Sequence, residues 1–292
     1  MHFQDITALE MFIDYQRAQN LAATTIRNRR SILTTFARRT GTLVDCDVFT
    51  LRRYIGRDDA VSAGTRRTER GALIAFYTFL QDEGLRADNP AAKLPVVRVP
   101  KGQPRPFTPE QIDAMLTSGA YAKTRAMILL GYYQGFRVSS IARVHGHDID
   151  LDGRTIATLV KGGKERRLPL HDVIADLALT MPRDGYWFPA RGGQAGHIRA
   201  SSVTDLITKA KVRAGITDPK LTPHSLRHAF GTDLVEQGVD IRVVQELLVH
   251  EHLSTTQIYT AVSERRKQDG IRTLAPREVP ARSGRGAAKI AA

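Results

Sequence analysis

Near the end of the chain, four polar residues have the types and the spacing that phosphoryl transfer needs. His224 and Arg227 come first, His250 follows, and Tyr259 stands nine residues after His250. A tyrosine hydroxyl, whose unperturbed pKa is about 10, becomes a nucleophile beside cations or a base. An arginine carries a permanent charge on a planar fork that matches phosphate oxygens. These residues therefore predict attack by Tyr259 on an anionic phosphodiester.

A helix is expected to carry the first two of these residues. Thr222 and Pro223 have the pattern of an N-cap followed by a proline in the first turn, and Gly238 is a helix stop. His224 and Arg227 are three residues apart and share one face, while an apolar stripe occupies another. We therefore expect this polar pair to point away from the core.

Two further helices are expected to deliver the other two residues. One begins at Asp240 and ends with His250, and Ser254 and Gln257 have the spacing of a capping box that starts the next. Tyr259 then lies in the second turn of that last helix. Short connections between the three helices can bring the four side chains into one cleft.

The ordered set resembles the signature of the tyrosine recombinases, the phage integrase and Xer family. The H-x-x-R of HSLRH, the His of LLVH and the Tyr of STTQIYT carry this resemblance. It implies an enzyme that cleaves and rejoins DNA through a 3′-phosphotyrosine and an expelled 5′-hydroxyl, with no ATP, cofactor or metal. It also implies the simple type of recombinase, which lacks an arm-binding domain.

Two upstream positions match the remaining catalytic residues of the family. Arg137 in GFRVSSIARV is similar to the first-arginine motif, although Ser140 stands where the family commonly has a Glu that would brace the arginine. Lys161 in LVKGGKERRLPL matches the family's hairpin lysine, to which the resemblance assigns protonation of the 5′-hydroxyl. By themselves, an Arg at a helix junction and a Lys at a hairpin tip are more typical of solvated residues. The candidate catalytic residues are Arg137, Lys161, His224, Arg227, His250 and the nucleophile Tyr259.

The charge balance indicates a polyanionic partner. The formal net charge is +13 with a pI near 10.2, and the excess of basic residues is spread over both halves of the chain. An ordinary protein with a basic surface is the alternative. Cys46 is the single cysteine, which excludes an internal disulfide and a thiolate metal site. With no signal peptide pattern and no long apolar run, we expect a protein of the bacterial cytoplasm or nucleoid, away from membranes.

The length and the helical pattern predict two domains and a mainly α fold with a small antiparallel β-sheet, an α+β class. The segment between them has five prolines, four basic residues and no acid over residues 93–109, and is expected to be the linker. We expect a helical core-binding domain, a basic proline-rich linker, a mixed catalytic domain and a basic mobile tail, over residues 1–92, 93–106, 107–274 and 275–292. Helices in the first domain are expected over about 6–18, 24–39, 47–56 and 65–82.

The expected catalytic domain contains an apolar helix over 124–134 that Gly135 ends, which leaves Arg137 at a helix-to-helix junction. Residues 148–170 have two hairpin patterns, with turns at Asp152-Gly153 and Gly162-Gly163, and so predict a three-stranded sheet. One more helix is expected between 198 and 215.

Basic residues on two N-terminal helices, in the linker and at the hairpin are candidate phosphate contacts. A solvated charged face is the ordinary outcome for one such helix, but two of them in a basic protein favour contact with DNA. The candidates are Arg27, Arg30, Arg66, Arg67, Arg70, Arg98, Lys101, Arg105 and Lys164.

Three other functions stay open. A non-catalytic helix-turn-helix regulator needs only the basic helices and the helical pattern of residues 222–250. A type IB topoisomerase uses much the same site as a tyrosine recombinase. A zinc hydrolase would use His224 and His228, but HSLRH lacks the Glu that metalloproteases place after the first His. We expect His228 to have a supporting role.

The expected partner is double-stranded DNA carrying attachment or core sites. Two protomers would bind the inverted half-sites of one site, and two such dimers would form a tetrameric synapse. Integration or excision of a mobile genome is the expected task, with chromosome or plasmid resolution left open. A monomer in solution and a directionality factor also stay open.

Overall fold

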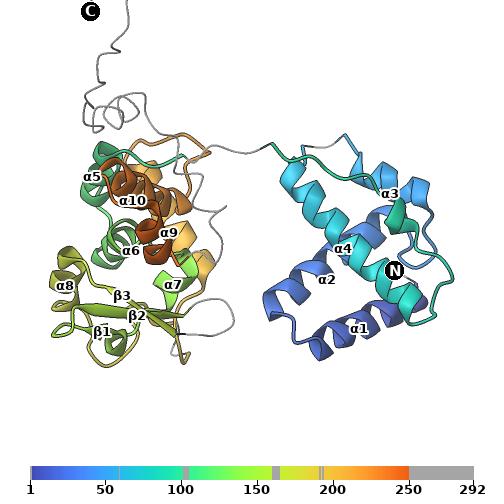
Figure 1. The fold of residues 1–292 in the computed structure, drawn as a ribbon, viewed down its shortest axis with the longest axis horizontal. Coiled ribbons are helices and arrows are strands. Elements are labelled where there is room, and N and C mark those ends of the chain that lie inside the picture. Colours follow the sequence, from blue (N-terminus) through green and yellow to red (C-terminus); the bar gives the residue numbers. More distant parts are fainter. Residues whose placement is uncertain are drawn as a thin grey trace, which may run out of the picture. The chain divides into compact units, whose positions relative to one another are not determined.

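The computed structural model describes residues 2–58, 60–100, 105–159, 165–190, 192 and 194–249. It divides into two compact units, Met1–Gly102 and Gln103–Ala292, and each is described by itself (Figure 1). The structure confirms the predicted fold class, because it is mainly helical and contains a small antiparallel sheet. The finer limits at residues 92, 106 and 274 stay predictions. None of the described helices is long and apolar enough to cross a membrane.

The first unit contains the four helices that the sequence predicts, followed by a 3₁₀ turn. Their bounds are α1 Phe3–Ala18, α2 Ala23–Thr40, α3 Val48–Ile55, α4 Ala63–Asp82 and η1 Pro90–Lys93. Asp47 and Ser62 cap α3 and α4 by accepting hydrogen bonds from Thr50 N and Thr65 N. Gly41 ends α2 in the left-handed region with a φ of 84°. Aromatic side chains from three of the helices, Phe12, Phe36 and Phe76, are fully buried in the core of this unit.

The second unit combines helices with a three-stranded antiparallel sheet of order β1-β2-β3. The strands are β1 Ile149–Asp150, β2 Thr155–Leu159 and β3 Glu165–Pro169, and η2 Gly146–Asp148 precedes them. The helices are α5 Pro109–Thr117, α6 Ala122–Tyr133, α7 Val138–Arg143, α8 Asp172–Ala178, α9 Ala200–Arg213, α10 His224–Glu236 and α11 Ile241–Leu247.

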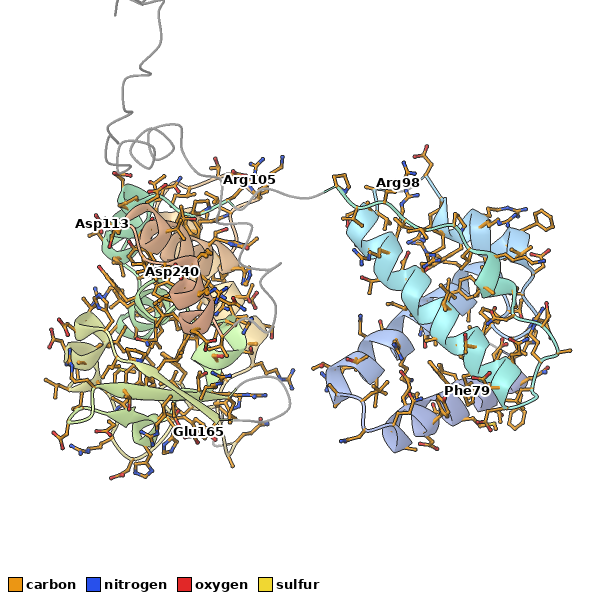
Figure 2. All side chains as sticks on the ribbon, viewed as in Figure 1. Phe79, Arg98, Arg105, Asp113, Glu165 and Asp240 are labelled. Atoms are coloured by element: carbon orange, nitrogen blue, oxygen red, sulfur yellow. The ribbon has the colours of Figure 1, made fainter. Side chains whose placement is uncertain are left out.

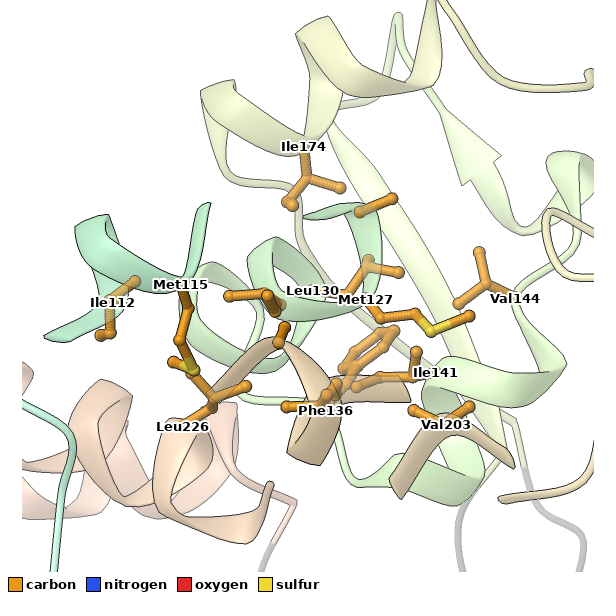
Figure 3. Close-up of a cluster of buried hydrophobic side chains, with 14 of the residues drawn as sticks. Ile112, Met115, Met127, Leu130, Phe136, Ile141, Val144, Ile174, Val203 and Leu226 are labelled. Atoms are coloured by element: carbon orange, nitrogen blue, oxygen red, sulfur yellow. The ribbon is translucent and has the colours of Figure 1, made fainter. Parts of the chain in front are cut away.

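Side chains from the six helices α5 to α10 meet in the core of this unit (Figure 3). Met127 and Leu130 come from α6, and Leu226 comes from α10. The two helices approach closely, since a Cβ added at Gly131 would lie 3.0 Å from Leu226 Cδ1. The helix that carries His224 and Arg227 is therefore packed directly against the helix that leads to Arg137.

Two local features differ from what the sequence predicts. The first predicted hairpin turn is a four-residue turn in which Arg154, with a φ of 51°, adopts the left-handed conformation, while Gly153 N donates to Asp150 Oδ1. The seven-residue α8 was not predicted, because such a short helix has too little periodicity to detect. The second predicted turn, at Gly162-Gly163, lies outside the described residues.

The start of α10 also differs from the N-cap that the sequence suggests. Pro223 has helical torsion angles, but no side chain caps the helix. Thr222 instead donates its N–H to Ser225 Oγ at 3.2 Å, and its carbonyl accepts from Ser225 N at 2.8 Å. Two downstream signals are present as predicted, since Gly238 follows α10 with a φ of 93° and Asp240 caps α11. Helix α11 ends at Leu247, however, three residues before the predicted end at His250.

Candidate active site

Arg227 is a buried arginine that joins three elements. Only 3% of the residue is exposed. From α10, its Nη1 donates to the carbonyl of Gly135, at the end of α6, and its Nη2 donates to the carbonyl of Leu248, at the end of α11. The expectation that both members of the polar pair point away from the core is therefore wrong for Arg227, because α11 and the α6–α7 junction cover its side of the helix.

Gly135 allows this contact. Its φ of 62° lies in the left-handed region, and a Cβ there would stand 2.6 Å from Phe230 Cδ1. The preceding residue, Gln134, is 5% exposed, and both ends of its amide are bonded: Nε2 donates to Pro169 O at 2.6 Å, and Oε1 accepts from His171 N at 3.4 Å. The junction after α6 is thus fixed to the end of β3 and presents its carbonyl to Arg227.

Arg137 stands two residues farther along, in a contrasting environment. It is the exposed N-cap residue of α7, and its side chain makes no hydrogen bond or ion pair to the rest of the described chain. Ser140, on the first turn of α7, is half-buried and has no carboxylate with which to brace it. An arginine held this way can turn its fork toward a ligand without breaking a contact within the described residues.

The two arginines line one small pocket. Leu159, the last residue of β2, and Val249, which follows α11, line the same pocket. Lys161 is two residues beyond Leu159, and His250 is the next residue after Val249. Lys161, His250 and Tyr259 themselves lie outside the described residues. Two of the three described candidates, Arg137 and Arg227, therefore share a pocket that His224 does not line. The chain leads from this pocket directly to two of the three candidates outside the described residues.

His224 is on the exposed side of α10, one helical turn from His228. The two rings meet edge to face with their centroids 4.8 Å apart. Partial burial, together with the charges of His228, Arg227 and Arg137, lowers the pKa of His224 to about 4, and burial also lowers the pKa of His228. More than a third of His224 is exposed, so solvent moderates this shift. A neutral imidazole is nevertheless the form of His224 that partial burial and the two arginines favour at pH 7.

A second polar contact joins α6 to α10. The Tyr132 hydroxyl donates to Asp233 Oδ2 at 2.6 Å, and burial, together with this carboxylate, raises the pKa of Tyr132. Sequence reasoning missed Tyr132, Gln134 and Asp233. Their only signal was a polar side chain within or just after an apolar helix, which does not identify the partner.

The candidate DNA-binding arginines of the first unit fall into two groups. Arg27 and Arg67 are exposed on α2 and α4, and Arg30 is half-exposed and paired with Glu10 at 2.6 Å. Arg66 donates to the carbonyls of Ile55, Arg57 and Val61, and Arg70 donates twice to the carbonyl of Leu94. The second group fastens loops of the unit.

The linker candidates lie at the described ends of that segment. Arg98 is exposed, and Arg105 is 3.5 Å from Asp218 in an exposed ion pair (Figure 2). Lys101 and the hairpin residue Lys164 lie outside the described residues. A groove between α2 and α4 adds polar groups that the sequence did not single out, among them Thr24, Asn28 and Thr68.

The second unit matches a known family over most of its length. Residues 106–266, more than half of the chain, match the phage integrase family. The chain belongs to the phage integrase family. Tyrosine recombinase XerD of Rhizobium meliloti (strain 1021) is 32% identical over 294 residues, which cover 92% of this chain and 94% of that protein.

Solved structures share the fold. A lambda integrase dimer bound to a COC′ core site aligns with 85% of this chain and 96% of its own, with a TM-score of 0.71 at 17% sequence identity. A lambda integrase tetramer bound to a Holliday junction aligns with 88% of this chain and 78% of its own, also with a TM-score of 0.71 at 17% identity. At this level of identity the likeness concerns the fold alone.

The predicted recognition is confirmed. This phage integrase family member is a tyrosine recombinase, an enzyme that cleaves and rejoins DNA. Family membership therefore supports an enzyme over the non-catalytic regulator and the zinc hydrolase.

Proposed function

We propose that Arg137, Lys161, His224, Arg227, His250 and Tyr259 form one active site for site-specific recombination. The observation that carries this proposal is the pocket shared by Arg137 and Arg227, which is lined by the last residue of β2 and by the residue after α11. Two arginine charges at one pocket match the needs of phosphodiester cleavage, in which a pentacoordinate transition state gains negative charge.

The two arginines divide the work on the phosphate. Arg137 has no partner to release among the described residues and turns its fork to the non-bridging oxygens. Arg227 contributes a fixed charge at the inner wall of the pocket, because two carbonyls hold its guanidinium in place. Preorganised donors of this kind contribute on the order of 10²- to 10³-fold in rate each.

The proton transfers follow from the remaining residues. The Tyr259 oxygen attacks phosphorus while its proton passes to the neutral imidazole of His224, and the bond from phosphorus to the 5′-oxygen breaks. Lys161 gives a proton to the leaving 5′-oxygen, and His250 hydrogen-bonds the phosphate or positions Tyr259. The 3′-phosphotyrosine keeps the bond energy, so a second 5′-hydroxyl reverses the step and rejoins a strand without ATP.

The first unit grips the duplex through α2 and α4. Arg27 and Arg67 are exposed for phosphate contact, and Arg30 joins them by exchanging Glu10 for a phosphate. The groove between the two helices offers the hydroxyls of Thr24 and Thr68 and the amide of Asn28 to base edges. Arg98, Lys101, Arg105 and Lys164 extend the basic path, whereas Arg66 and Arg70 act mainly by holding loops.

The proposed assembly is a dimer on each site and a tetramer in the synapse, in the bacterial cytoplasm where its DNA lies. The lambda integrase dimer on a core site and its tetramer on a Holliday junction support this arrangement. We propose integration or excision of a mobile genome as the task. Chromosome or plasmid resolution is the second candidate. Recombination between two non-identical sites points to integration, and recombination only between identical sites points to resolution.

The proposal is tested with a pool of nicked suicide duplexes of randomised sequence. Wild-type protein should become covalently attached to a subset of them, and Tyr259→Phe should abolish the adduct while half-site affinity stays within about twofold. Tyr121→Phe is the matched control, because Tyr121 is 77% exposed at the start of α6. An adduct that persists in Tyr259→Phe, or one lost equally in Tyr121→Phe, rejects Tyr259 as the nucleophile.

A further inference from the structure

Lys211 is a buried lysine that the proposed reaction does not use. Only 7% of it is exposed, in the last turn of α9, and it makes no ion pair with a described carboxylate. Its Nζ instead donates to the carbonyls of Asp218 and Leu221, each at 2.9 Å. Burial of an ammonium group without a counter-charge is costly and uncommon. Within the described residues, the hydrogen bonds to these two carbonyls are therefore what offsets the burial of the Lys211 charge.

These carbonyls belong to the segment that enters α10. Leu221 is three residues before His224, and its own N–H donates to the Asp218 carbonyl at 3.3 Å. Asp218 O thus accepts from Lys211 and from Leu221, which closes the segment on itself. Because no side chain caps α10, the path of this segment decides where the helix begins.

Further contacts connect the segment that enters α10 to the candidate site. Leu221 is buried in the core, and Thr222 exchanges hydrogen bonds with Ser225 in the first turn of α10. Phe107 N donates to Ser225 O at 3.4 Å, so the start of α10 is held from the other side as well. His224 lies inside this set of contacts, and Arg227 is one turn farther along.

We propose that Lys211 is a positioning residue for DNA cleavage: its ammonium holds the entrance of α10 and so sets where His224 and Arg227 stand relative to the scissile phosphate. This inference rests on the proposed catalytic roles of those two residues. A displacement of about 1 Å in a catalytic group costs up to about 100-fold in rate. Loss of the ammonium should therefore reduce the cleavage step and leave DNA binding intact.

The test compares K211M, which keeps the length of the side chain without its charge, with K211R, which keeps the charge. K209M is the matched control, because Lys209 is exposed on the same helix. Each is measured on a suicide duplex recovered from the randomised pool, at a temperature where all variants are folded. We expect single-turnover cleavage by K211M to fall about 10- to 100-fold, with half-site affinity within twofold of wild type. K211R should recover most of the rate, and K209M should match wild type.

Hydrogen exchange provides a readout independent of activity. Amides of residues 218–227 should exchange faster in K211M than in wild type, and those of K209M should be unchanged. If K211M does not fold, K211Q is measured in the same way.

Cleavage by K211M within twofold of wild type overturns the inference, as does an equal loss in K209M or a loss of affinity that accounts for the whole effect. Failure of the wild-type protein to form any adduct overturns the proposed function instead. In that case exchange alone decides whether Lys211 holds α10, and equal exchange in K211M and wild type rejects it.

Discussion

The α6–α7 junction and helix α10 each present one arginine to the same pocket, yet the two side chains are held in opposite ways. The Arg137 side chain is exposed and makes no hydrogen bond to the rest of the described chain, whereas Arg227 is 3% exposed and donates to the carbonyls of Gly135 and Leu248. The Arg137 side chain can reorient at little cost in free energy, whereas the Arg227 side chain is packed in the interior. Residues of the same type and the same proposed role can therefore differ in what they contribute to stability.

The buried arginine also fixes the backbone segments that carry other residues of the proposed site. The Gly135 carbonyl that holds Arg227 is two residues from Arg137, so the buried arginine also fixes the backbone from which the exposed one extends. The Leu248 carbonyl lies two residues before His250. Arg227 thus connects three segments of the proposed site through hydrogen bonds, whereas the Arg137 side chain connects none of the described segments in this way.

The largest expected effect is the difference in stability between alanine variants of the two arginines. Arg227→Ala should slow single-turnover cleavage by at least about 10²- to 10³-fold and also lower the free energy of unfolding by roughly 2–4 kcal/mol, since two buried carbonyls lose their donor and a cavity remains. Arg137→Ala should cause a similar loss of rate, with the free energy of unfolding within about 0.5 kcal/mol of wild type. Adduct formation and urea denaturation measure the two quantities. Equal losses of stability would remove the distinction.

Gly135 is the point at which the α6–α7 junction contacts α10, and a side chain at this position should force the two apart. Gly135→Ala places a methyl group 2.6 Å from the Phe230 ring at a φ of 62°. We expect a loss of about 2–4 kcal/mol in the free energy of unfolding, from overpacking combined with backbone strain. Gly119→Ala is the matched control, because its φ is 74° but the space around it is open. That control should lose only about 1 kcal/mol. If both lose the same amount, the close approach of Phe230 is not the cause.

The pH dependence of cleavage tests how strongly the two arginines act on the pKa of His224. The pKa of His224 is lowered to about 4, first by partial burial and then by His228 and the two arginines. A neutral base loses its function as it is protonated, so cleavage should be constant from about pH 6 to 8. It should then fall about tenfold per unit only below the pKa of His224. His228→Gln removes a neighbour that would itself become cationic in acid, and should move this acid limb to higher pH. A limb near pH 6.5 in the wild type would show that the neighbours do not act on His224.

Much of this arrangement could be predicted from local signals. Gly135 and Gly238 were identified as helix stops, and both have positive φ angles. The cap of α11 at Asp240 was also identified, because an N-cap depends on residues two or three positions away. Such features are decided within one turn of chain, so the sequence contains the information needed to locate them.

What could not be predicted depends on distant parts of the chain. Helical periodicity puts His224 and Arg227 on one face, but it does not say that α11 covers Arg227 and leaves His224 exposed. Arg66 and Arg70 looked like phosphate contacts because nothing in the sequence indicates which carbonyls lie within reach of a folded arginine. Lys211 and Gln134 were missed for the same reason, since their partners are set by tertiary packing.

The smallest expected effect tests whether α6 and α10 act as one body. Tyr132→Phe removes the hydrogen bond to Asp233 and leaves a half-buried carboxylate that water can still reach, so we expect a loss of about 1 kcal/mol in the free energy of unfolding. This contact joins the same two helices as the contact between Arg227 and Gly135. Residues that share a rigid interface are coupled, so Tyr132→Phe combined with Arg227→Ala should cost less than the sum of the two changes. A double-mutant cycle in urea measures this coupling. Strict additivity would mean that Arg227 holds the α6–α7 junction alone, without help from the rest of the interface.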